Sequence, residues 1–174
     1  MTGEHGLDPL QETVDHVRGP ESASVILEYG DYECPFSRRA YRAIQSIEAQ
    51  LGDGVRFAWR HFPLTEIHPH ALSASLAAEA AAEQGRFWEM HDVLFHRQQA
   101  LEDDDLRRYA GELGLDLDRF DRDWAGEAAP KRVERDYRSG LESGQVLGTP
   151  TLFIDGVVHE GGFDAETLLA ALTR

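Results

Sequence analysis

One cysteine is the residue of this sequence with the clearest capacity for covalent chemistry. Cys34 is the only cysteine among 174 residues, and it stands in the segment DYECPFS. A thiolate is the nucleophile of sulfur chemistry, and the free N–H groups at a helix N-terminus stabilise it. Pro35 suits the first turn of a helix, because it has no N–H and its φ is already helical. The segment therefore predicts a nucleophilic cysteine at the start of a helix.

Ser37 follows Cys34 by one helical turn, and two interpretations of its role are possible. Its hydroxyl could donate a hydrogen bond to the sulfur, or it could be a solvated serine of the first turn with no catalytic part. Because the chain has a single cysteine, it cannot close an internal disulfide and is restricted to mixed disulfides with other thiols. Release of a partner from Cys34 then needs a thiol from outside, such as glutathione.

The segments around Cys34 predict a strand, a helix and a second strand. Residues 24–29, SVILEY, are a short β-branched and apolar run that a glycine closes, which is typical of a buried strand. Apolar residues then recur at spacings of four and three over residues 40–51, which indicates a helix that stops at Gly52. Residues 55–62 alternate as a strand does. Cys34 is therefore expected where a strand passes into a helix.

The remainder of the chain predicts helices followed by a hairpin and a last helix. Residues 66–145 contain alanine-rich and amphipathic segments with helical spacing. The runs TLFI and VVHE flank Asp155-Gly156, a dipeptide that favours a tight hairpin turn. Asp164 is a suitable N-cap for the last helix.

Two separated motifs resemble those of the DsbA-like branch of the thioredoxin superfamily. They are DYECPFS after a strand and GTPTLFIDG at residues 148–156, and FPL, ALSASLAAEAA and QGRFWEMHDVLF between them are also similar. The resemblance implies an α/β thioredoxin-like fold, in which helices flank a central mixed sheet and an all-helical insert precedes the cis-proline strand. The expected boundaries are a flexible segment over 1–13 and one domain over 14–174, with its core in 14–65 and 146–174 and its insert in 66–145.

The resemblance also implies a four-residue redox centre, Cys34, Pro35, Phe36 and Ser37, in which Cys34 is the nucleophile. Ser37 stands where the family usually has a second cysteine. Two origins of this serine stay open: a native monothiol centre, or an engineered replacement of a resolving cysteine that traps complexes. In either case the chain as sequenced cannot run a dithiol oxidase cycle.

Three further residues receive roles from the resemblance alone. Pro150 is expected to be a cis-proline that faces Cys34, and the backbone of Thr149 is expected to bind an extended thiol-bearing partner like an added strand. Glu28 matches a buried acid of the family that helps to move protons. The alternative for Glu28 is a position at a sheet edge that points to solvent.

These features predict a thiol-disulfide oxidoreductase that acts through mixed disulfides. It would need no tightly bound cofactor, with glutathione as a possible co-substrate. One alternative is a glutathione transferase or isomerase of the kappa-like type, but these enzymes carry serine where Cys34 stands. Another is a non-catalytic thioredoxin-fold module that holds peptides, in which Cys34 would be dispensable.

Charge and composition narrow the possible partners. The chain has 17 Lys and Arg against 32 Asp and Glu, and its formal net charge of −15 disfavours nucleic acid and anionic lipid surfaces. Protein or small-molecule thiols and disulfides are the expected partners, and the oligomeric state is left open. Residues 1–20 lack the basic start and apolar stretch of a signal peptide, and a single cysteine suits a reducing compartment. We therefore expect a cytoplasmic location.

Histidines invite a metal hypothesis that their spacing does not favour. The sequence contains no HExxH, and His91 and His96 are five residues apart, which is off a shared helix face. The histidines considered are His61, His68, His70, His91 and His96. We expect no metal site.

Overall fold

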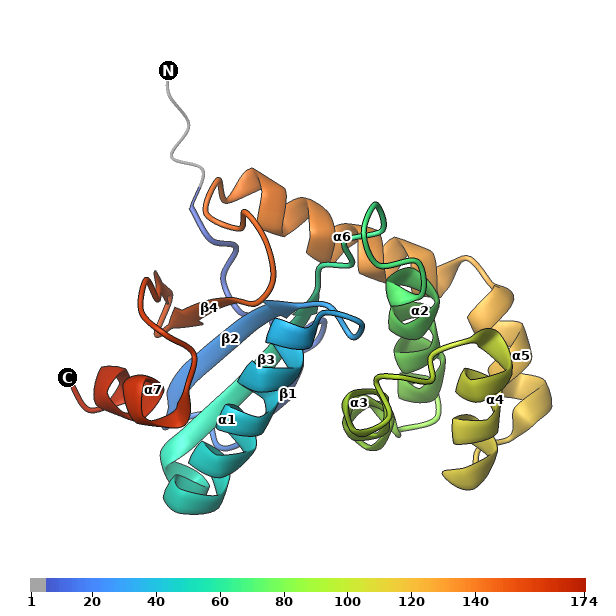
Figure 1. The fold of residues 1–174 in the computed structure, drawn as a ribbon, viewed down its shortest axis with the longest axis horizontal. Helices are drawn as coiled ribbons and strands as arrows, with labels where there is room; N and C mark the ends of the chain where they lie inside the picture. Colours follow the sequence, from blue (N-terminus) through green and yellow to red (C-terminus); the bar gives the residue numbers. More distant parts are fainter. Residues whose placement is uncertain (1–5) are drawn as a thin grey trace.

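A computed structural model describes residues 6–174 of the chain, and a mixed five-stranded sheet runs through its centre (Figure 1). Its strand order is β1-β3-β2-β4-β5, in which β2 and β3 are parallel and the other neighbours are antiparallel. The strands are β1 (His16–Arg18), β2 (Ser24–Gly30), β3 (Val55–His61), β4 (Thr151–Ile154) and β5 (Val157–Val158).

Helices cover the sheet and form the insert between β3 and β4. They are α1 (Pro35–Leu51), the short 3-10 helix η1 (Gly52–Gly54), α2 (Ala71–Ala82), α3 (Phe87–His96), α4 (Asp103–Glu112), α5 (Leu117–Ala125), α6 (Ala128–Glu142) and α7 (Ala165–Leu172). In Figure 1, α1 and α7 lie beside each other over the sheet, and α2 to α5 extend to one side. Within residues 6–174, every helix is too short or too polar to cross a bilayer.

The alternation of side chains along β2 explains how one strand serves two faces of the sheet. Ile26 belongs to the larger apolar core, which also contains residues of α1, α7 and the insert. Leu27 and Tyr29 belong to a second, smaller core on the opposite face, against which Tyr137 of α6 packs. Because successive strand residues point to opposite faces, Glu28 lies on the same face as Ile26, the face that α1 covers.

The thioredoxin-like fold expected from the sequence is confirmed, including the strand, helix, strand unit and the helical insert before β4. Strand β1 was missed, because three residues are too few to show a period and the strand forms by pairing with β3. Of the flexible segment expected over 1–13, residues 1–5 lie outside the described part of the chain. The carbonyl groups of Asp8 and Pro9 accept hydrogen bonds from Arg60 of β3 at 3.0 and 3.1 Å, so this stretch is held against the sheet.

Candidate active site around Cys34

Cys34 is the N-cap residue of α1, and Pro35 occupies the first helical position, as the sequence predicts. The thiol residue is only 3% exposed. Its backbone is fixed on both sides of the helix start: its N–H donates to the carbonyl group of Asp31 at 3.1 Å, and its carbonyl group accepts from the N–H of Arg38 at 3.1 Å. The side-chain amide of Gln98, a residue of the insert, also donates to the Cys34 carbonyl group at 2.8 Å. The sulfur therefore sits on a rigid strand-to-helix junction.

The second motif meets the first at the sulfur. The peptide bond between Thr149 and Pro150 is cis, as expected, and the Cys34 thiol donates to the carbonyl oxygen of Thr149 at 3.5 Å. These residues are 115 positions apart in the sequence. The hydroxyl oxygen of Thr149 is buried and has no hydrogen-bond partner among the described residues. The fold thus places one thiol beside the backbone of the cis-proline segment.

Ser37 is fully buried, so its interpretation as a solvated serine is wrong. Its hydroxyl oxygen accepts a hydrogen bond from the backbone N–H of Asp31 at 3.2 Å. This contact closes the loop that leads from β2 to Cys34, since Asp31 stands before the thiol and Ser37 after it. In this structure Ser37 therefore fixes the loop on which the thiol sits.

Glu28 is buried in the middle of the sheet, not at an edge. It is 1% exposed, and its strand β2 lies between β3 and β4. Burial raises the pKa of Glu28 to about 8, and the carboxyl oxygen Oε1 has no hydrogen-bond partner among the described residues. Desolvation disfavours the charged form of an acid, so Glu28 can hold a proton near neutral pH.

Asp31 organises the loop before Cys34, and sequence reasoning missed it. It is fully buried, and its Oδ1 accepts from the backbone N–H groups of Glu33 at 2.7 Å and Cys34 at 3.2 Å. Its Oδ2 accepts from the N–H of Leu64 at 2.9 Å and from the ring of His68 at 2.8 Å. Four donors compensate the buried carboxylate, which joins the thiol loop to the segment that follows β3.

Glu33 makes a parallel connection to the same segment. Its carboxylate accepts from the backbone N–H of His70 at 2.6 Å and from the ring Nδ1 of His70 at 2.9 Å. The hydrogen bond to Glu33 raises the pKa of His70. The pairing of the two acids in DYE with the two histidines in HPH carried no signal in the sequence, because the partners are 37 residues apart.

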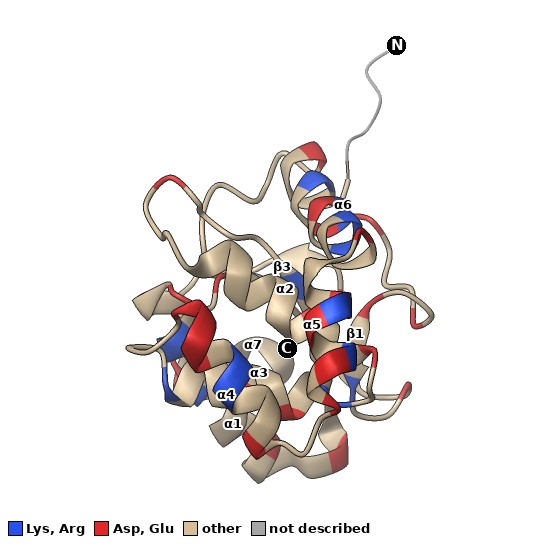
Figure 2. Ribbon diagram, turned by 90° about the vertical axis from the view of Figure 1, so that its right-hand side faces the viewer, with Lys and Arg blue, Asp and Glu red and all other residues tan. Residues whose placement is uncertain are grey.

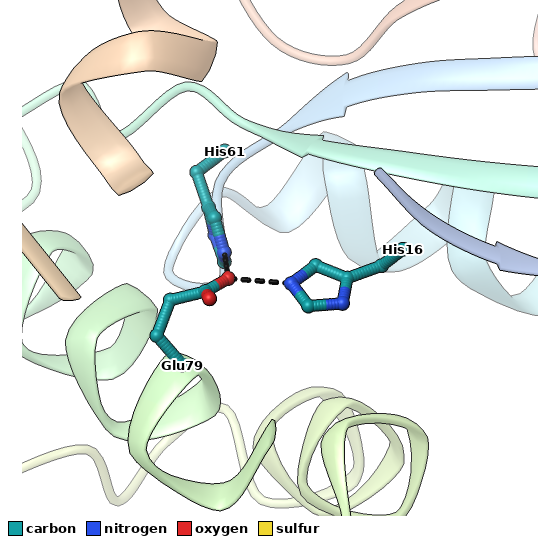
Figure 3. Close-up of side chains that lie close together, drawn as sticks. All are labelled: His16, His61 and Glu79. Carbon is teal, nitrogen blue, oxygen red and sulfur yellow. Dashed lines mark hydrogen bonds and ion pairs between the residues drawn. The ribbon is translucent and has the colours of Figure 1, made fainter. Parts of the chain in front are cut away.

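A second cluster of titratable groups lies between β1, β3 and α2 (Figure 3). One carboxylate oxygen of Glu79 accepts from His16 Nε2 at 2.6 Å and from His61 Nε2 at 2.7 Å. Burial opposes ionisation of Glu79, but the hydrogen bonds from His16 and His61 outweigh it and hold the pKa of this carboxyl far below its usual range. Of these three residues, the sequence had singled out only His61.

The hydrogen bonds of His61 decide what this cluster does. The indole N–H of Trp59 donates to His61 Nδ1 at 3.2 Å, so a neutral His61 ring carries its proton on Nε2. This N–H donates a hydrogen bond to Glu79. A metal ligand needs a lone pair on the ligating nitrogen. The geometry therefore favours a hydrogen-bonded network that ties β1 and β3 to α2. Three other histidines form hydrogen bonds elsewhere: His68 with Asp31, His70 with Glu33 and His91 with the hydroxyl group of Tyr32.

Comparison with known proteins agrees with this fold. A family model described as thioredoxin matches residues 11–174. Among solved structures, a thioredoxin-like oxidoreductase from Silicibacter pomeroyi is 26% identical, with a TM-score of 0.82 over 94% of this chain and 92% of that chain. The protein alpha-DsbA1 from Wolbachia pipientis is 17% identical, with a TM-score of 0.76 over 95% of this chain and 91% of that chain, a likeness of fold.

A curated relative is much longer than this chain. The Na+/H+ antiporter NhaA 1 of Salinispora arenicola is 45% identical over 166 residues, which are 95% of this chain and 25% of that protein. The chain thus spans about a quarter of the length of the curated relatives that it matches.

Proposed function

Because the chain belongs to the thioredoxin family and has the fold of DsbA-type proteins, we propose that it exchanges thiols and disulfides through Cys34. One observation carries the proposal. The single cysteine is the N-cap residue of α1, and its sulfur lies 3.5 Å from the carbonyl oxygen of Thr149 in the cis-proline segment. A cysteine in this position combines the start of a helix with a backbone segment along which a partner chain can pair.

The exchange step balances without a cofactor. The Cys34 thiolate attacks one sulfur of a partner disulfide, a new S–S bond forms to that sulfur, and the old S–S bond breaks. The second partner sulfur leaves with the electron pair and takes up a proton. Glu28 is a candidate proton store for the thiol on this face of the sheet, since its raised pKa lets it carry a proton near pH 7.

A second thiol must come from outside the chain. Ser37 occupies the place one turn after Cys34, and a serine hydroxyl is far too weakly acidic to attack a mixed disulfide. We therefore propose that a small thiol such as glutathione resolves the adduct, in a reducing compartment such as the cytoplasm.

The first test is the formation of the adduct itself. Oxidised glutathione should add one glutathione per chain, seen by intact-mass spectrometry, and dithiothreitol should remove it. Cys34→Ala should form no adduct, and S-methylation of Cys34 should abolish disulfide exchange. A wild-type chain that resists modification while folded would refute the exchange function and favour a peptide-holding module. Glutathione conjugation that survives S-methylation would favour the transferase alternative.

A second candidate function follows from the long relatives, which are named as Na+/H+ antiporters. We propose that this domain works together with such an antiporter: the Cys34 thiolate attacks a disulfide of the antiporter, forms a mixed disulfide with one of its sulfurs and breaks the old S–S bond, and the other sulfur leaves as a thiol. Since Ser37 cannot release that disulfide, the complex should survive on a non-reducing gel and vanish with dithiothreitol. Recovery of the same amount of antiporter with Cys34→Ala would exclude a role for the thiol in this association.

A further inference from the structure

Three arginines at the start of α1 have no carboxylate to balance them. Among the described residues, the cations without an acidic group within 4.0 Å are Arg38, Arg39, Arg42, Arg122 and Arg174. The first three of them follow Cys34 within the first eight residues of α1. In a chain with a net charge of −15, this concentration of unpaired positive charge beside the thiol is unexpected.

The insert shows how charges are arranged elsewhere in the molecule. Acidic and basic residues are interspersed along α4, α5 and α6 (Figure 2). Arg107 pairs with Asp121 at 3.0 Å, and Arg138 pairs with Glu134 at 2.7 Å. The start of α1 lacks such partners, so its guanidinium groups remain available to an external anion.

Two of these arginines, Arg39 and Arg42, border an apolar groove of about 600 Å³ between α1 and the start of α7. Phe36 is 51% exposed, and its ring meets the ring of Phe163 edge to face, with centroids 6.4 Å apart. The guanidinium carbon of Arg39 lies 5.7 Å from the centroid of the Phe163 ring, and Arg42 lines the groove further along α1. The groove therefore offers aromatic surface and positive charge together.

One acid lines this groove, and it is already engaged. The carboxylate of Asp164 caps α7, where it accepts from the N–H of Thr167 at 3.0 Å and from its hydroxyl group at 2.8 Å. Hydrogen bonds from the N–H and the hydroxyl group of Thr167 lower the pKa of Asp164. Asp164 forms no ion pair within 4.0 Å with Arg39 or Arg42, so both guanidinium groups remain available and the lining carries a formal net charge of +1.

We propose that Arg39 and Arg42 make this groove select acidic residues in the apolar segment of a partner protein that lies next to the cysteine reacting with Cys34. The inference rests on the proposed exchange function and names the class of substrate. An aliphatic or aromatic side chain would cover Phe36 and Phe163, while neighbouring carboxylates would meet Arg39 and Arg42. Glutathione has carboxylates but no apolar side chain to cover the two rings, so a segment of a protein fits the groove better than glutathione does.

The expected energetic contribution is modest, because the arginines are exposed. Ion pairs at the surface are weak, and their largest effect is on the rate of encounter and on the choice of partner. Two of them should change the exchange rate by roughly three- to tenfold at physiological salt, and the advantage should shrink as salt increases.

The test compares synthetic peptides whose single cysteine is activated by a coloured aromatic thiol. One pair carries Glu-Glu-Leu or Gln-Gln-Leu before the cysteine, and a second pair carries them after it. Release of the aromatic thiol gives the rate of attack by Cys34. With the wild-type chain, the Glu peptide of at least one pair should react roughly three- to tenfold faster than its Gln counterpart.

The matched variants separate local charge from net charge. R39Q/R42Q removes two unpaired cations from the groove, and R122Q/R174Q removes two unpaired cations that lie away from it. The first variant should bring the ratio of Glu to Gln rates close to one, whereas the second should keep it.

Each outcome has a separate meaning. Equal rates for Glu and Gln peptides in the wild-type chain, or a ratio that survives in R39Q/R42Q, would overturn the groove proposal while exchange at Cys34 stands. If R39Q/R42Q slows the reaction with oxidised glutathione as much as the reaction with the Glu peptide, the arginines recognise glutathione and not a protein segment. That result would overturn the proposal as stated. If no peptide reacts at all, the exchange function itself fails.

Discussion

Ser37→Cys is expected to release glutathione from Cys34 without any added thiol. The new thiol would stand one helical turn from the sulfur, within the reach of an unstrained disulfide. It would attack the Cys34 sulfur, form the internal disulfide and expel the glutathione thiol. An oriented intramolecular attack replaces a bimolecular step, so release should be at least about a thousandfold faster than with about 1 mM external thiol.

Intact-mass spectrometry after rapid acid quenching follows this release with time. Ser46→Cys is the matched control, because it adds a thiol to the same helix twelve residues from Cys34, about 18 Å along the axis. In that variant both cysteines should keep their glutathione. If Ser37→Cys retains its adduct as long as the wild-type chain does, the buried contact between Ser37 and Asp31 has turned position 37 away from the sulfur.

Glu28→Gln is expected to raise the free energy of unfolding by about 3 kcal/mol at pH 7. Burial raises the folded-state pKa of Glu28 to about 8 from its ordinary value of 4.5, so between these pH values the folded chain binds a proton that the unfolded chain has lost. The stability of the wild-type chain therefore falls as pH rises from about 4.5 to about 8. Glutamine has the shape of the protonated acid and is free of this dependence.

Urea unfolding at several pH values measures the effect. The difference between Glu28→Gln and the wild-type chain should approach zero near pH 4.5 and grow toward pH 8. Glu79→Gln should show the opposite sign, because His16 and His61 hold the pKa of Glu79 below its usual range and its stabilising contribution disappears as pH falls. A difference for Glu28→Gln that stays constant with pH would show that the residue ionises freely in the folded chain.

The sequence predicted the elements that carry a local period, and it missed the contacts that join distant segments. The strand before Cys34 and the helix after it were readable because apolar spacing and the stop at Gly52 are local signals. The cis-proline segment was placed by its resemblance to a family. Strand β1 and the contacts of Asp31 with His68 depend on pairing across the fold, which no short window of sequence reveals.

Ser37 and Glu28 show the limit of reasoning from residue type. The sequence places both in the site but leaves two interpretations of each. A serine in a first turn, or an acid in a strand, can face either water or the protein interior. Packing across the fold determines whether these two side chains are buried. Glu28 is buried because β2 is a central strand, and Ser37 is buried where its hydroxyl group accepts from the N–H of Asp31.

The side-chain amide of Gln98 gives the insert a part in the behaviour of the thiol loop. It donates to the carbonyl groups of Tyr32 and Cys34 at 2.9 and 2.8 Å, from the turn between α3 and α4. In hydrogen exchange, proteins open locally in cooperative units, and contacts between two segments favour their opening together. We therefore expect the helical insert and the loop that holds the sulfur to open together, so that a substrate or variant that loosens one of them changes the amide protection of the other.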